Sequence, residues 1–240
     1  MAAVVVLVAG VPQVLEAARS DQGGDTIAGE ETGPPAPSPE PGRAAEIVGP
    51  VRGADLQGYV DDRTTALLEA PGTVDTAIVS FTDVLSVQDA LTLVTAAGEV
   101  RAVLYRLPVP QAASRTVRVG PGDDIAEALQ ADLAGRVEDL QQERQAAVDL
   151  LESGTVDDEA FIADYERLVA ELDDAIAAAE DGRLVHAVVV RGDIEDLRGL
   201  VDEVGIRLVD PAPPGTDIAL SVFSGLLPAD TATVSEGRAG

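Results

Sequence analysis

The chain contains no cysteine, no lysine and no asparagine, and aromatic residues make up only 2% of its 240 residues. Without cysteine there are no disulfides, no thiol catalysis and no structural Cys-zinc site. Without lysine, P-loop, Schiff-base and pyridoxal-phosphate chemistry lack their essential amine. With three Tyr, three Phe and no Trp, few side chains can stack on bases or sugars, so Val, Leu, Ile and Ala must build the core.

Basic residues are also scarce, because 16 arginines stand against 43 acidic residues and the formal net charge is −27. Proteins that bind nucleic acid use Lys and Arg to neutralise phosphates, so this composition argues against nucleic acid as a partner. It equally disfavours adsorption to anionic lipid headgroups. Two explanations of the acidity stay open: solubility through self-repulsion, or a basic partner or divalent cations.

The first 50 residues have the composition of a membrane tether rather than of a folded domain. Residues 2–18 are mostly apolar, although they include Pro, Gln and Glu, and their length is at the lower limit for a membrane-spanning helix. They lack the preceding positive residues of a signal peptide. We expect a membrane anchor or signal segment over residues 1–18, with a buried strand as a further possibility, and a disordered Pro/Gly-rich linker over residues 19–50.

Two segments of the chain repeat one pattern. Residues 86–98 and 193–205 each begin with a capping residue, carry apolar residues at helical spacing and end in glycine, and each lies between two β-branched runs. The repeat predicts an α+β fold over residues 51–228, in which two β-α-β-β units form a mixed sheet with helices on one face. Residues 229–240 are expected to be a disordered tail. The expected strands are 76–81, 100–107 and 115–119 in the first unit and 184–191, 206–209 and 217–223 in the second, with helices over 61–70, 87–97 and 194–204.

Residues 122–181, between the two units, show a different pattern. Apolar residues recur every three or four positions in two runs separated at Gly154, which predicts a long antiparallel α-helical hairpin that interrupts the duplicated domain. This segment holds 19 Asp or Glu and three Arg, a net charge of −16. We therefore expect it to face a partner. The candidate partner-facing residues are Glu138, Asp139, Glu143, Asp173 and Asp174.

The sequence offers no catalytic, cofactor-binding or metal-binding set. His186, the single histidine, lies in an expected strand, where alternation places it with Leu184 and Val188 and favours a packed role over a ligand role. A serine–histidine–acid triad has no Gly-x-Ser-x-Gly motif to support it. Most of the adjacent acidic pairs lie at expected helix ends or on the solvent face, and two of them, Asp123-Asp124 and Asp157-Asp158, lie at expected helix N-termini, where the helix dipole favours negative charge. Neighbouring carboxylates on a helix diverge, so these pairs do not form a site. The strand arginines are expected to form ion pairs with these acids rather than to bind an anion. They are Arg101, Arg191 and Arg207.

Three short motifs carry a resemblance to a known group of proteins. They are Val188-Val-Val-Arg-Gly-Asp193, Gly205-Ile-Arg-Leu-Val-Asp-Pro-Ala-Pro213 and Phe223-Ser-Gly-Leu-Leu-Pro228. With the acidic helical segment before them, they make residues 70–228 resemble uncharacterised membrane-anchored extracytoplasmic proteins of actinomycetes, some of which are labelled anti-sigma-like. The resemblance implies an N-terminal membrane segment and an exported domain. It implies no functional residues, because that group carries no agreed activity.

Together these patterns favour a non-enzymatic extracytoplasmic binding domain that is tethered to the cell membrane and needs no cofactor. The expected partner is an unidentified protein or envelope component, with a basic surface as one candidate. The alternative is a carboxylate-based hydrolase with a cleft between the two repeats. A closed pocket with two inward carboxylates about 5–9 Å apart would favour the hydrolase, and a flat sheet with solvated helices would favour the binding domain.

Overall fold

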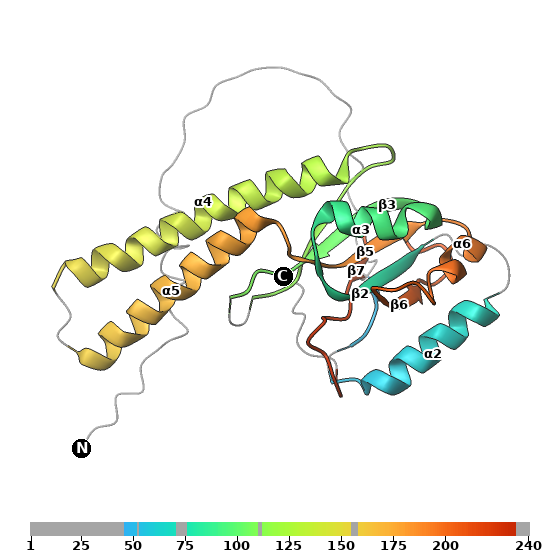
Figure 1. Cartoon of the computed structure of the whole chain (residues 1–240), viewed down its shortest axis with the longest axis horizontal. Coiled ribbons are helices and arrows are strands. Elements are labelled where there is room, and N and C mark those ends of the chain that lie inside the picture. The colour runs from blue at the N-terminus through green and yellow to red at the C-terminus, as the bar shows by residue number, and fades with distance from the viewer. Residues whose placement is uncertain (1–45, 52, 71–75, 110–111, 155–157, 234–240) are drawn as a thin grey trace, which may run out of the picture. The chain divides into compact units, whose positions relative to one another are not determined.

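The computed structural model describes residues 46–51, 53–70, 76–109, 112–154 and 158–233 (Figure 1). The expected anchor, most of the expected linker and the end of the expected tail lie outside the described residues. The described part contains five α-helices, a five-stranded antiparallel sheet and a separate two-stranded parallel sheet, so the fold is α+β. None of these helices is long and apolar enough to cross a membrane.

The main sheet has the strand order β4-β3-β5-β2-β6, and every neighbouring pair is antiparallel. The expectation of a mixed sheet is therefore wrong for this sheet. The reason is that the two strand–helix–strand connections interleave. Strand β5 lies between β2 and β3, and β2 lies between β5 and β6, so neither connection joins neighbouring strands. This is a split β-α-β arrangement. The strands are β2 (Ala77–Leu85), β3 (Glu99–Tyr105), β4 (Arg115–Arg118), β5 (Val185–Arg191) and β6 (Ile206–Pro211).

Two short helices make the connections between the interleaved strands. Helix α3 (Val87–Val94), continued by the 3-10 turn η1 (Thr95–Ala97), connects β2 to β3. Ser86 caps α3 by accepting the backbone N–H of Asp89, as its position in the sequence predicts. Helix α6 (Ile194–Gly199) connects β5 to β6 and is shorter than expected, because residues 200–205 form turns.

Helix α2 (Leu56–Glu69) packs against β6. It begins before the expected residue 61 because Asp55 caps it by accepting the N–H of Gly58. A buried carboxylate, Asp210 of β6, fastens the helix to the sheet. It accepts hydrogen bonds from the hydroxyl of Tyr59 and, at 2.5 Å, from Nε of Arg63.

The two faces of the sheet are covered differently. Alternate strand residues such as Val79, Val103 and Val188 pack against α3 and α6 in one large apolar cluster. On the opposite face, Ile78, Leu104 and Val189 belong to a second cluster with residues of the small parallel sheet. Both faces are therefore buried, which is why the strands are near-continuous apolar runs rather than alternating ones.

The small sheet pairs β1 (Ile47–Val48) in parallel with β7 (Val222–Phe223). β1 falls in the range expected to be linker, so the folded part of the chain begins before residue 51. Residues 217–221, expected to be strand, form turns instead. The last strand that the sequence predicts for a second unit therefore pairs with β1, whereas β4, expected as the last strand of a first unit, joins the main sheet.

Two long helices, α4 (Ile125–Glu152) and α5 (Glu159–Asp181), pack side by side and extend away from the sheet (Figure 1). Asp124 and Asp158 cap them, and each accepts two backbone N–H groups, in agreement with the sequence expectation for acidic pairs.

The first turns of α4 belong to the core of the sheet. Ile125 and Leu129 are buried in the same cluster as the strands. The hydroxyl of Tyr105, on β3, donates to Asp132 at 2.5 Å, and Arg115 of β4 lies 3.4 Å from the same carboxylate. The base of the helical pair is therefore fixed to the sheet edge.

Candidate functional site

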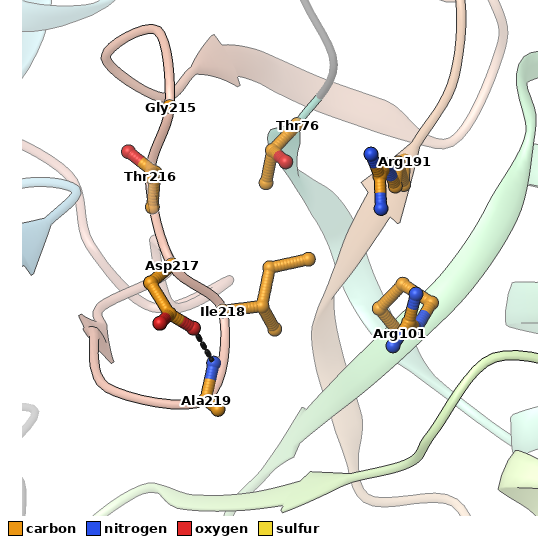
Figure 2. Close-up of a pocket in the computed structure, with 8 residues that line it drawn as sticks. All are labelled: Thr76, Arg101, Arg191, Gly215, Thr216, Asp217, Ile218 and Ala219. Atoms are coloured by element: carbon orange, nitrogen blue, oxygen red, sulfur yellow. Dashed lines mark hydrogen bonds between the residues drawn. The ribbon is translucent and has the colours of Figure 1, made fainter. Parts of the chain in front are cut away.

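A pocket of about 300 Å³ lies where the first residues of β3 and the last residue of β5 face the turn at residues 215–219 (Figure 2). Ile218 of that turn also packs against the apolar cluster on the face without α3 and α6. The pocket is therefore at the margin of that face. The lining residues are Thr76, Arg101, Arg191, Gly215, Thr216, Asp217, Ile218 and Ala219.

Arg101 reaches the pocket because β3 is bulged at this residue. Between Val100 and Ala102, β3 has one more residue than β5, and Arg101 is the extra one. A bulge re-aims a side chain without changing the faces of its neighbours. Arg101 is nearly buried, its Nε and Nη2 atoms donate to the carbonyl of Val119 at 3.3 Å, and Nη1 lies 3.7 Å from Glu99 Oε2.

Arg191 is positioned by a close approach of two backbone segments. Gly98 has a φ of 140°, and a Cβ on it would lie 2.2 Å from the carbonyl oxygen of Arg191. A Cβ on Gly192 would lie 1.8 Å from the carbonyl oxygen of Ala97. Only glycine fits at either position. The Arg191 side chain itself is exposed and makes no hydrogen bond or ion pair with any described residue.

The facing wall holds one carboxylate. Asp217 Oδ1 accepts the N–H of Ala219 at 2.9 Å, and the Thr216 hydroxyl donates to a backbone carbonyl at 2.7 Å. Thr76 is buried, and its hydroxyl makes no hydrogen bond with the described side chains or backbone. The pocket thus combines two guanidinium groups with a single carboxylate, whereas carboxylate-based glycosidases need two.

The pattern of the sequence does not reveal this site, because it assigns the strand arginines to ion pairs with acids. That assignment is wrong for Arg191, which has no partner among the described residues, and for Arg207, which donates instead to backbone carbonyls, including that of Leu227 at 2.5 Å. Arg101 keeps a long contact with Glu99. One signal is present in the sequence: Arg101 follows Gly98 by three residues, and Arg191 directly precedes Gly192, so each arginine is near a glycine at the end of its strand. Only strand pairing brings the two arginines together.

The five candidate partner-facing residues lie on α4 and α5, and all are exposed. Three of them have partners within the helices: Asp139 with Arg136 at 3.4 Å, Asp173 with Arg144 at 2.5 Å, and Glu138 with Gln142 at 3.4 Å. Glu143 and Asp174 have no hydrogen-bond or ion-pair partner in the described part of the chain. The Arg144–Asp173 pair links the two helices, so Asp173 also contributes to their packing.

His186 lies in a second bulge, where β5 has one more residue than β3 between Val185 and Ala187. Val185 and Val188 both pack on the helix-covered face, so the alternation expected through His186 does not hold. The ring is 1% exposed, and its Nε2 atom lies 3.1 Å from Ser114 Oγ. Nδ1 has no partner of good hydrogen-bond geometry among the described residues.

Burial is the main cause that lowers the pKa of His186 to about 4, and the charge of Arg106 acts in the same direction. A backbone hydrogen bond with Leu226 and the charge of Asp230 partly oppose this lowering of the pKa. A buried neutral ring with this pKa is a weak general base at neutral pH. The Ser114–His186 contact therefore has the chemistry of a packed hydrogen bond rather than of an activated serine.

No group of three or more His, Asp or Glu in the described ranges is arranged to hold a metal ion. Comparisons of the chain with protein-family models, with curated proteins and with solved structures find no match. A function must therefore be inferred from the geometry and charge of the chain's own residues.

Proposed function

We propose that this chain is a non-enzymatic extracytoplasmic binding domain, tethered to the cell membrane by its N-terminal segment, and that α4 and α5 present the surface that meets its partner. The partner is a protein or envelope component with a basic surface. The apolar composition of residues 2–18, the Pro/Gly-rich stretch after them and the resemblance to membrane-anchored actinomycete proteins support the tether.

The observation that carries the proposal is the uncompensated charge on the two long helices. Residues 122–181 hold 19 Asp or Glu and three Arg, and each of the three Arg is already paired with an acid of the same segment. Among the described residues of this segment, most carboxylates therefore have no guanidinium within reach. Like charges this dense repel one another within the Debye length of about 8 Å at physiological salt. A basic partner relieves that repulsion and is attracted over the same range.

We further propose that the two strand–helix–strand units descend from an internal repeat and that residues 122–181 are a helical hairpin inserted between them. The alignment of residues 86–98 with 193–205 supports a repeat. So does the equivalent position of α3 and α6, since each connects two strands that flank a third.

The test is partner binding by a protein with a neutralised helix surface. A partner captured from envelope extracts is titrated with wild-type protein and with a five-fold variant carrying Glu138→Gln, Asp139→Asn, Glu143→Gln, Asp173→Asn and Asp174→Asn. We expect the variant to bind at least about tenfold more weakly at low salt, and wild-type binding to weaken steeply as salt is added.

A matched control removes five exposed carboxylates from other elements: Asp62→Asn, Glu69→Gln, Asp83→Asn, Asp202→Asn and Glu203→Gln. It changes the net charge by the same amount and should leave affinity within about twofold. A double variant, Glu143→Gln with Asp174→Asn, isolates the two residues that have no partner in the described structure. Unchanged binding by the five-fold helix variant at both salt concentrations would show that the helices do not contact the partner.

A further inference from the structure

Arg191 stands in the pocket without a counter-ion among the described residues, in a chain with 43 acidic residues. The acid best placed to neutralise it is Glu99, which is its cross-strand partner in the register. Glu99 is engaged elsewhere, however. Its Oε1 accepts the N–H of Gly122 at 2.8 Å, and its Oε2 lies 3.7 Å from Arg101 Nη1. The Arg191 guanidinium is left with all its donors available to a ligand.

We propose that this pocket binds the carboxylate of a small organic acid, with Arg191 as the principal donor and Arg101 as the second. A guanidinium group matches a carboxylate through two parallel hydrogen bonds. Figure 2 shows both arginines on the strand side of the pocket, across from Asp217 and Ile218. The carboxylate lies on the strand side, within reach of the Thr76 hydroxyl, which has no hydrogen-bond partner among the described residues, and the rest of the ligand contacts Ile218.

Charge and size argue for a small carboxylate rather than a phosphate. The lining contains two arginines and one aspartate, and Glu99 offsets part of the charge of Arg101. At most one positive charge is uncompensated, which matches a monoanion better than a doubly charged phosphate monoester. A volume of about 300 Å³ is at the lower end of the range for small-molecule pockets.

The experiment follows the guanidinium Nε–H signals of the ¹⁵N-labelled protein by NMR during titration with sodium acetate, sodium butyrate or inorganic phosphate at constant ionic strength. Because the chain has 16 Arg and no Lys, few side-chain signals compete. The signal of Arg191 is assigned by its absence from the Arg191→Gln variant. Arg191 is exposed and unpaired in the described structure, so this substitution should preserve the fold, which circular dichroism checks.

We expect acetate and butyrate to shift the Arg191 and Arg101 signals in a saturable manner. Arg191→Gln should raise the dissociation constant at least tenfold. The control variant is Arg167→Gln, which removes an exposed arginine of α5 and should bind as the wild-type protein does. Shifts of all arginines in parallel without saturation, or equal affinity in the Arg191→Gln variant, would overturn the site. Saturation by phosphate alone would overturn the assignment to a carboxylate. Because α4 and α5 do not line this pocket, none of these outcomes bears on the proposed protein partner.

Discussion

Lowering the pH from 7 to 5 should destabilise the folded protein through His186, a buried ring with a pKa lowered to about 4. In the unfolded chain an imidazole has a pKa of about 6.5. Between these values the unfolded state binds a proton that the folded state does not, so stability falls as the pH falls. With 1.36 kcal/mol for each pKa unit, the loss is about 2 kcal/mol between pH 7 and pH 5 and about 3 kcal/mol once the pH is below 4.

The assay is urea unfolding followed by circular dichroism at several pH values, with the wild-type protein compared with His186→Gln. The glutamine amide can still hydrogen-bond to Ser114 but does not titrate. The many carboxylates titrate in both proteins, including Asp210, whose pKa is raised by burial and which acts in the opposite direction, so their contributions cancel in the difference. Equal changes in unfolding free energy for the two proteins between pH 7 and pH 5 would refute the reasoning.

Two further predictions concern the packing around the sheet. Arg63→Met should lower the unfolding free energy by about 3 kcal/mol, because it leaves the Asp210 carboxylate buried with Tyr59 as its remaining hydrogen-bond donor, and adding Asp210→Asn should recover part of the loss in urea unfolding. Gly192→Ala should lower the melting temperature, at a cost of more than about 1 kcal/mol, since its Cβ would meet a carbonyl oxygen. Gly135→Ala, in an open position of α4, should raise the unfolding free energy by about 0.5–1 kcal/mol and therefore raise the melting temperature. A higher melting temperature for Gly192→Ala than for Gly135→Ala would contradict the backbone argument.

Local signals in the sequence predicted much of the secondary structure. Ser86 and Asp158 marked helix starts correctly because a cap depends on a few adjacent residues. The sequence pattern does not indicate the start of α2, because the apolar periodicity there is weak even though Asp55 and Gly58 have the spacing of a helix cap. The antiparallel main sheet could not be predicted, since strand order depends on which strand inserts between two others, and β5 arrives about 80 residues after β3.

The same difference between local sequence patterns and strand pairing decides which candidate site can be predicted. The acidic surface could be predicted because charge density is a property of sequence alone. The pocket could not, because Arg101 and Arg191 meet only through strand pairing and through a bulge that hydrophobic alternation does not reveal. His186 shows the same limit. In a regular strand it would lie on the same face of the sheet as Val188, but the additional residue in β5 changes which side chains surround it.

The bulges at Arg101 and His186 behave like single-residue insertions, one in each strand, that together restore the register between β3 and β5. Residue numbers paired across β3 and β5 add up to 290 before the first bulge, to 291 between the two and to 290 again after the second. Each polar residue has therefore been added without moving an apolar neighbour to the wrong face. Deleting Arg101 would close the ladder and keep Val100 and Ala102 on their own faces, and it would remove the backbone hydrogen bond that the N–H of Val119 donates to the Arg101 carbonyl. Single-residue deletions at the bulges, more than substitutions, would therefore remove a polar side chain while the apolar residues of the sheet keep their faces.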